Sequence, residues 1–312
     1  MTLRLHSLIF ALVAVVPGPL AAQDAPAPLE VPTQTFRSAV DLVTIQASVR
    51  DRRGRPLVGL KPSDFEIRDN DQIRPILSLR ADVRAPLSVA VLVDMSGSMR
   101  LDPKTAMARQ AFDAVLSQLR EGDDEIALFT FDADLHERHP FTRQFGEVRD
   151  ALASFEPFGS TSLYDAAAET ARRVAARSAT HKAVIVLTDG TDTSSTLTAA
   201  EVSGIASSID VPVFIVATVP AIDERVRMQA ADASPDDGSA NLRDLAEWTG
   251  GQLVFASTFT ETAGAARGLI GGLRLQYVLA IEAANTREWR RLDVRVKAPA
   301  ATVKARSGYF GG

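Results

Sequence analysis

The stretch that decides the fold is residues 88–99, SVAVLVDMSGSM, where an apolar run ends on an aspartate and a serine-rich turn. The run 88–93 carries no charge, which is typical of a strand buried on both faces of a parallel sheet. Asp94, Ser96 and Ser98 follow at the end of this strand, where open α/β sheets bind their ligands. The stretch therefore predicts an α/β domain with a binding site at this point.

The chain on both sides of this stretch alternates between apolar runs and amphipathic segments. The runs predict further buried strands over residues 125–131, 183–187 and 211–219. Helical spacing of apolar residues predicts helices over residues 105–119, 165–177, 199–209, 241–249 and 260–273. This alternation predicts a doubly wound, mostly parallel, Rossmann-like sheet over residues 86–273. The polar residues 220–240 are predicted to form an exposed loop.

The two flanks of this domain have the spacing of short strands. Apolar side chains alternate in residues 40–50, and turn signals follow, which predicts a β segment over 37–85. Strand spacing returns in residues 275–282 and 290–297. We expect the C-terminal segment 274–312 to pack with the N-terminal one in a smaller β domain.

The N-terminus predicts a signal peptide over residues 1–22, cleaved after Ala22. Its strongly apolar run, residues 8–16, is far shorter than the roughly 20 residues that a membrane-spanning helix needs. We therefore expect no membrane insertion after cleavage, and a periplasmic or secreted mature chain. Residues 23–36, rich in Pro and Ala, are predicted to be a linker.

Composition narrows the classes of function. The formal net charge is -5, and the Lys and Arg residues are scattered, which argues against nucleic acid as a partner. The chain has no cysteine, which excludes disulfides, thiol chemistry and a lipoprotein anchor. The G-x-S-x-G, H-E-x-x-H and P-loop motifs are missing, and the four histidines lack zinc-ligand spacing. We therefore expect a binding protein rather than an enzyme.

Two further loops add oxygen donors to those of Asp94, Ser96 and Ser98. Thr161 stands in a glycine-containing loop that leads into a predicted helix, and Asp189 follows a predicted buried strand. All three loops are attached to the same predicted sheet. Carboxylates and hydroxyls together form an oxygen-only ligand set, which suits a hard cation such as Mg²⁺ or Ca²⁺.

With these donors in place, the sequence resembles a von Willebrand factor A (VWA) domain with a complete metal-ion-dependent adhesion site. The resemblance covers roughly residues 86–273. The D-x-S-x-S signature of the family falls on the aspartate and two serines above, its loop threonine on Thr161, and its acidic residue after the fourth strand on Asp189. Residues 49–68 and 276–310 resemble the flanks of a subgroup of exported bacterial VWA proteins.

The resemblance also implies how such a site works. In the family, an acidic side chain of a partner protein typically occupies the open position on the ion. Charge counting agrees, because Asp94 and Asp189 balance the divalent charge while a hard cation takes six or more oxygen ligands. We expect Mg²⁺ first, with Mn²⁺ or Ca²⁺ as alternatives. The partner's identity and the oligomeric state are left open by the sequence.

Two other functions stay open. An exposed cation could activate water for hydrolysis, with Asp132 or Asp192 as candidate general bases, although both stand in loops where solvated carboxylates are common. Alternatively, the chain could be a structural envelope protein in which the metal only stabilises the fold.

Overall fold

In the part of the chain that it describes, the computed structural model is built around a six-stranded sheet. The strand order is β10-β9-β8-β5-β6-β7. The strands are β5 (Leu87–Asp94), β6 (Glu125–Phe131), β7 (Leu135–Thr142), β8 (His181–Thr188), β9 (Val213–Thr218) and β10 (Gln252–Ala256). All neighbours are parallel except β7, which runs antiparallel to β6. Every residue of β5, β6 and β9 is buried, as their continuous apolar runs require.

The structure describes residues 41–101, 103–152, 156–219 and 241–311. The predicted signal peptide (1–22), the predicted linker (23–36) and the predicted loop 220–240 lie outside these ranges. Within them, no helix has both the length and the apolar character to cross a membrane.

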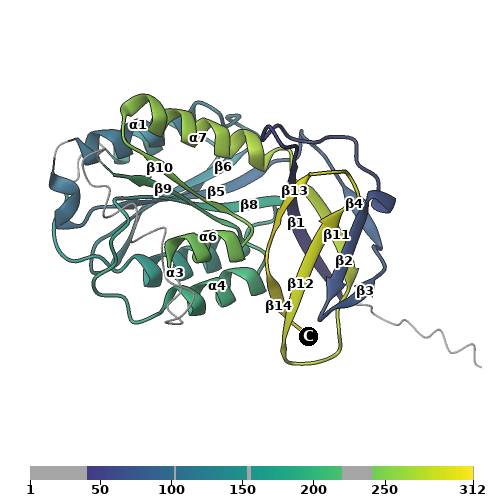
Figure 1. Ribbon diagram of the computed structural model, residues 1–312. Coiled ribbons are helices and arrows are strands. Elements are labelled where there is room, and N and C mark those ends of the chain that lie inside the picture. Colours follow the sequence, from purple (N-terminus) through teal and green to yellow (C-terminus); the bar gives the residue numbers. More distant parts are fainter. Residues whose placement is uncertain (1–40, 102, 153–155, 220–240, 312) are drawn as a thin grey trace, which may run out of the picture. The chain divides into compact units, whose positions relative to one another are not determined.

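Helices cover both faces of the central sheet (Figure 1). One face packs against α1 (Lys104–Leu116), α2 (Gly146–Ala151) and α7 (Phe259–Leu273). The other face packs against α3 (Leu163–Ala175), α4 (Ala199–Ser208) and α6 (Leu242–Trp248). The predicted fold class, a doubly wound and mostly parallel sheet, is confirmed.

Some elements of this domain escape the sequence-based prediction. Strand β7 has half-buried and exposed residues along its whole length, and its sequence LHERHPFT lacks an apolar period. It is held as an edge strand by pairing with β6 rather than by burial. Strand β10 and helix α2 span only five and six residues, too short for a period to be recognised.

The two flanking segments combine in two antiparallel four-stranded sheets, ordered β13-β1-β11-β4 and β14-β12-β2-β3 among the described residues. The N-terminal strands are β1 (Leu42–Arg50), β2 (Phe65–Asp69), β3 (Gln72–Arg74) and β4 (Ser78–Arg80). The C-terminal strands are β11 (Tyr277–Glu282), β12 (Trp289–Val296), β13 (Thr302–Ala305) and β14 (Gly308–Phe310).

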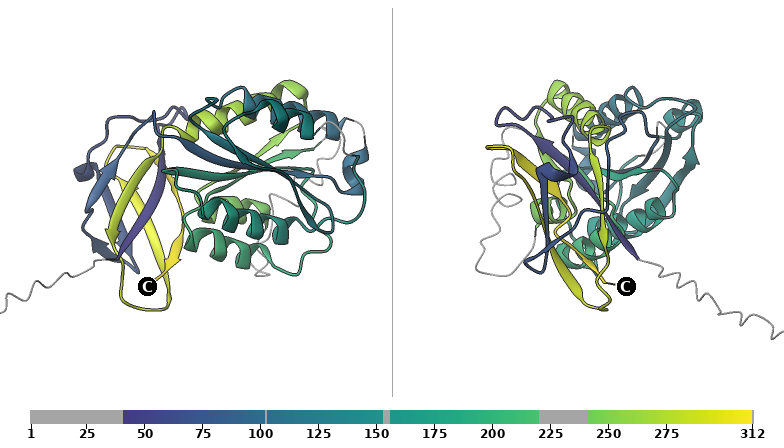
Figure 2. Two further views of the ribbon diagram at one scale, coloured as in Figure 1. Left: turned by 180° about the vertical axis from the view of Figure 1, so that it is seen from behind. Right: turned by 90° about the vertical axis from the view of Figure 1, so that its right-hand side faces the viewer.

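Pairing between the two ends of the chain is direct. Strand β1 pairs with β11 from Leu42 opposite Glu282 to Ala47 opposite Tyr277, and β2 pairs with β12. Figure 2 shows the purple strand β1 beside the yellow C-terminal strands. The predicted β structure built from both ends of the chain is therefore confirmed, whereas its division into a separate domain stays a prediction.

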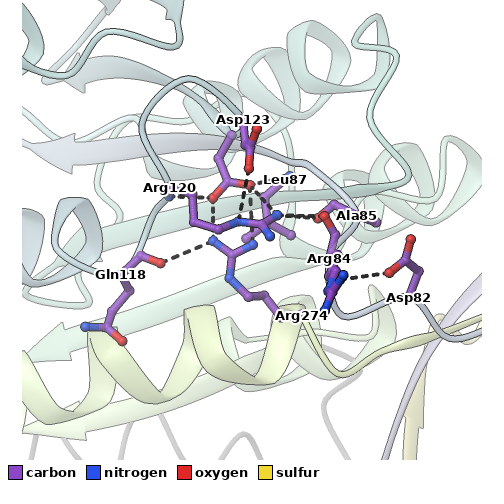
Figure 3. A network of polar contacts seen from close by, with 9 residues as sticks. Asp82, Arg84, Ala85, Leu87, Gln118, Arg120, Asp123 and Arg274 are labelled. Carbon is purple, nitrogen blue, oxygen red and sulfur yellow. Dashed lines mark hydrogen bonds and ion pairs between the residues drawn. The ribbon is translucent and has the colours of Figure 1, made fainter.

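A buried aspartate anchors the edge of the central sheet at which the parallel strands begin. The carboxylate of Asp124 accepts hydrogen bonds from the backbone N–H groups of Leu87 (3.0 Å) and Arg120 (2.7 Å), and it pairs with the guanidinium of Arg274. Figure 3 shows the side chains of Arg120 and Arg274 side by side, and both guanidinium groups contact the carboxylate of Asp124. Burial opposes ionisation, but the hydrogen bonds from Arg274 and the backbone outweigh it and lower the pKa of Asp124.

We expect Asp124→Asn to lower the free energy of unfolding by about 3 kcal/mol at pH 7, because Arg274 loses its buried counter-charge. The folded pKa of Asp124 lies below the unfolded one, so its contribution is present above about pH 4 and is lost as the pH falls through the folded pKa. The difference from wild type should therefore shrink in acid. Urea unfolding followed by circular dichroism measures it. Asp123→Asn is the control, because the Asp123 side chain is 67% exposed; equal losses in the two variants would contradict this role.

Candidate metal site

The loop after β5 carries three of the predicted donors. Asp94 is the last residue of the central strand β5, and its side chain is fully buried. Ser96 is buried and Ser98 half-buried in the turn that follows, which continues as a short 3-10 helix. The two serine hydroxyl oxygens lie 3.1 Å apart. Adjacent ligands of an octahedral Mg²⁺ are about 3 Å apart, so this spacing fits two ligands of one ion.

The carboxylate of Asp94 is bound by its neighbours on both oxygens. Oδ1 accepts a hydrogen bond from the backbone N–H of Ser96 (2.9 Å), and Oδ2 accepts one from the hydroxyl of Thr188 at the end of β8 (2.6 Å). Burial nevertheless raises the pKa of Asp94 to about 6, and the negative charge of Asp189 adds to the rise. The site therefore holds more negative charge than its hydrogen bonds compensate.

Thr161 is brought to the same edge by its loop. The backbone N–H of Gly97 donates to the carbonyl oxygen of Gly159 (2.9 Å), which ties this loop to the turn after β5. The carbonyl oxygen of Thr161 accepts from the N–H groups of Thr193 (2.9 Å) and Ser194 (3.0 Å), in the loop after β8. Thr161 is buried between the two. The three donor loops are thus joined by backbone hydrogen bonds.

Asp189, directly after β8, has a partner that the sequence analysis missed. Its Oδ2 accepts a hydrogen bond from Nζ of Lys104 at 2.8 Å. Lys104 is the first residue of α1. A helix N-terminus carries partial positive charge, so a lysine there is locally unfavourable unless an acidic side chain lies nearby. Thr188 was missed as well, because only its pairing with Asp94 reveals a role.

The carboxylates of the two candidate general bases both accept hydrogen bonds from nearby groups. Asp192 Oδ1 accepts from the N–H of Leu163 (2.8 Å) and the hydroxyl of Ser195 (2.6 Å), which holds the start of α3. Asp132 Oδ1 accepts from the N–H of Asp134 (3.0 Å). Among the residues that the structure describes, no group of three or more His, Cys, Asp or Glu is placed to hold a metal. The proposed donor set, with two carboxylates and three hydroxyls, is a different kind of cluster.

A groove of about 1200 Å³ lies elsewhere, lined by residues of α4, β12 and β14. None of the five oxygen donors lines it, and Trp248, Trp289 and Phe310 do. Its mainly apolar lining does not suit a hard cation. The predicted oxygen donors lie instead in the loops at the carboxyl edge of the central sheet.

A comparison with known protein families finds a match in this part of the chain. Residues 89–191 match the family model described as von Willebrand factor type A domain, and all five predicted donors lie within the match. These residues are therefore similar to a VWA domain, and the fold is VWA-like. None of the curated proteins matches the chain.

Several solved structures are similar to part of the chain. Conserved hypothetical protein BatB from Bacteroides thetaiotaomicron is 18% identical, with 60% of this chain and 98% of that chain covered and a TM-score of 0.46. An aerotolerance-related membrane protein from Bacteroides fragilis is 17% identical, with 59% and 98% covered and a TM-score of 0.45. The PilB minor pilin from Streptococcus sanguinis is 12% identical, with 62% of each chain covered and a TM-score of 0.48. Likenesses this remote carry no functional argument.

We expect Asp94→Asn to stabilise the metal-free protein at pH 7. The folded pKa is raised, which means that folding favours the protonated carboxyl. The loss of stability caused by ionised Asp94 is therefore absent below about pH 4 and grows as the pH rises through about 6. At neutral pH it is on the order of 3 kcal/mol. Asparagine keeps an oxygen for the N–H of Ser96 and turns its amide toward the Thr188 hydroxyl.

Thermal unfolding in EDTA between pH 4 and pH 7.5 measures this effect. Asp165→Asn is the matched control, because hydrogen bonds from Thr196 and Leu197 outweigh the effect of burial and lower the pKa of Asp165. Relative to wild type, that variant should lose stability by an amount that stays nearly constant over this pH range, because a lowered pKa means that Asp165 titrates below about pH 4. An Asp94→Asn protein that gains nothing over wild type across this range would show that the buried carboxylate is not under strain.

Proposed function

We propose that this chain binds a divalent cation through Asp94, Ser96, Ser98, Thr161 and Asp189, and uses the ion to dock an acidic side chain of a protein partner. The observation that carries the proposal is the convergence of three hydrogen-bonded loops at the carboxyl edge of the sheet, where the buried carboxylate of Asp94 lies beside the serine hydroxyls. Burial also raises the pKa of Asp94 to about 6. Buried charges are costly unless they are paired or coordinate a metal.

The chemistry of the donors supports a hard cation, Mg²⁺ first, with Mn²⁺ or Ca²⁺ as alternatives. Two carboxylates balance the divalent charge, and the three hydroxyls add ligands without adding charge. A ligand position left open on such an ion attracts an anionic oxygen, which an Asp or Glu side chain of a partner supplies. The ion then makes docking depend on metal.

We propose further that the protein acts outside the cytoplasm, in the periplasm or after secretion. This rests on the signal peptide predicted over residues 1–22 and on the resemblance of the flanks to exported bacterial VWA proteins. Binding, rather than hydrolysis, is favoured because both candidate bases already use a carboxylate oxygen. Asp132 accepts a hydrogen bond within its own loop, and Asp192 accepts one from the N–H of Leu163 at the start of α3.

We expect added Mg²⁺ to stabilise residues 23–312. Binding to the folded state alone adds RT ln(1 + [L]/Kd), which is about 2.7 kcal/mol at 100 times Kd. Thermal unfolding in EDTA, Mg²⁺, Mn²⁺ and Ca²⁺ measures the gain and ranks the ions. Asp94→Ala and Thr161→Val should lose it, whereas Asp132→Ala, a loop carboxylate outside the donor set, should keep it. No gain with any of the three ions in the wild type would contradict the metal site.

Docking is tested separately. Wild-type protein immobilised in Mg²⁺ should retain a partner from an envelope extract, release it in EDTA, and fail to retain it as Asp94→Ala. A protein that metal stabilises but that retains no partner in an EDTA-sensitive way would favour the alternative, a purely structural role for the ion.

A further inference from the structure

A lysine stands inside the proposed site without being one of its ligands. Nζ of Lys104 donates to Oδ2 of Asp189 at 2.8 Å. The Lys104 side chain is 12% exposed and that of Asp189 is 4% exposed. Most ion pairs on a protein surface are weak because water screens them, but this one is largely shielded. It therefore couples strongly to any other charge that enters the site.

The backbone holds this lysine in place. Lys104 opens α1, and the next residue, Thr105, bonds its hydroxyl to the carbonyl oxygen of Met99 in the turn after Ser98. The start of α1 is thereby fixed to the donor loop. The helix dipole disfavours an ammonium at this end, so the carboxylate of Asp189 is the interaction that compensates it.

We propose that Lys104 is the internal counter-ion of this site and competes with the divalent cation for Asp189. This inference rests on the proposed metal site. An ammonium has three donors and no lone pair, so Lys104 cannot ligate a metal. When the ion binds, Lys104 must either give up Asp189 or stay close to a second positive charge. Both alternatives weaken metal binding.

Lys104 also changes the net charge of the site that an acidic partner encounters. Asp94, Asp189 and Lys104, with charges of -1, -1 and +1 when all are ionised, sum to -1 without metal, and a divalent ion brings the sum to +1. The sign of the local charge therefore reverses on metal binding. An acidic side chain is repelled by the first state and attracted by the second. Without Lys104 the sum would change from -2 to 0, so Lys104 supplies the net positive charge that an acidic partner meets in the metal-bound state.

Isothermal titration of residues 23–312 with Mn²⁺ and Mg²⁺ tests the competition. We expect Lys104→Gln to lower the Kd by about tenfold, which corresponds to about 1.4 kcal/mol. Lys104→Arg keeps the positive charge and should leave the Kd near that of the wild type. Lys182→Gln is the matched control, because Lys182 lies at the other end of β8 and bonds to the carbonyl oxygen of Ala175; it should change nothing.

A second measurement needs no metal. In EDTA, Lys104→Gln should lower the melting temperature, because Asp189 loses its partner. Asp189→Asn in the Lys104→Gln background should recover much of that loss, and a double-mutant cycle isolates the coupling between the two side chains. Additive effects would show that no such pair exists in solution.

The outcomes separate the two proposals. A folded Lys104→Gln protein with an unchanged or higher Kd overturns the competition while the metal site stands. Binding by Lys104→Gln but not by the wild type supports the competition and shows that the lysine closes the site. Binding by neither protein overturns the competition and the metal site together.

Discussion

The burial of one carboxylate, that of Asp94, shapes everything around the candidate site. A buried charge must find hydrogen bonds in place of water. Ser96 and Thr188 supply them, and in doing so they fix the turn after β5 and join it to the end of β8. The raised pKa of Asp94 shows that these bonds leave the charge incompletely compensated. The loops thus hold an acidic residue in place at a cost that a cation would remove.

A second buried aspartate shows what full compensation looks like in the same sheet. Asp124 has two backbone N–H donors and the guanidinium of Arg274, and its pKa is lowered rather than raised. Both carboxylates are inaccessible to water, but Asp94 lies deeper in the protein. Asp124 also has a cationic partner in Arg274, so depth of burial and pairing together distinguish the two. Asp124 stabilises the folded state as a charged group. Asp94 is kept in an environment that disfavours its charged form, and such a loss of stability is typical of functional sites.

The parts of this structure that the sequence predicts are those set by local pattern. Strands β5 and β9 can be predicted from the sequence because a strand buried on both faces consists of continuous apolar residues. Strand β7 cannot be predicted in this way, because an edge strand is held by backbone pairing with its neighbour and does not require an apolar pattern. Within the site, the D-x-S-x-S spacing marks its donors directly. The pairing of Lys104 with Asp189 depends on two residues 85 positions apart meeting in space, which no local pattern encodes.

The donor set also bears on the choice between docking and hydrolysis. Hydrolysis at a metal needs a general base within hydrogen-bond reach of the attacking water. Asp192 already uses an oxygen to hold the start of α3, and Asp132 uses one within its own turn. Lys104, which pairs with Asp189, is a proton donor and not a base. Docking requires no general base. It needs an open ligand position and a local charge that turns positive when the ion arrives, and the arrangement of two acids, three hydroxyls and one lysine is suited to supply both.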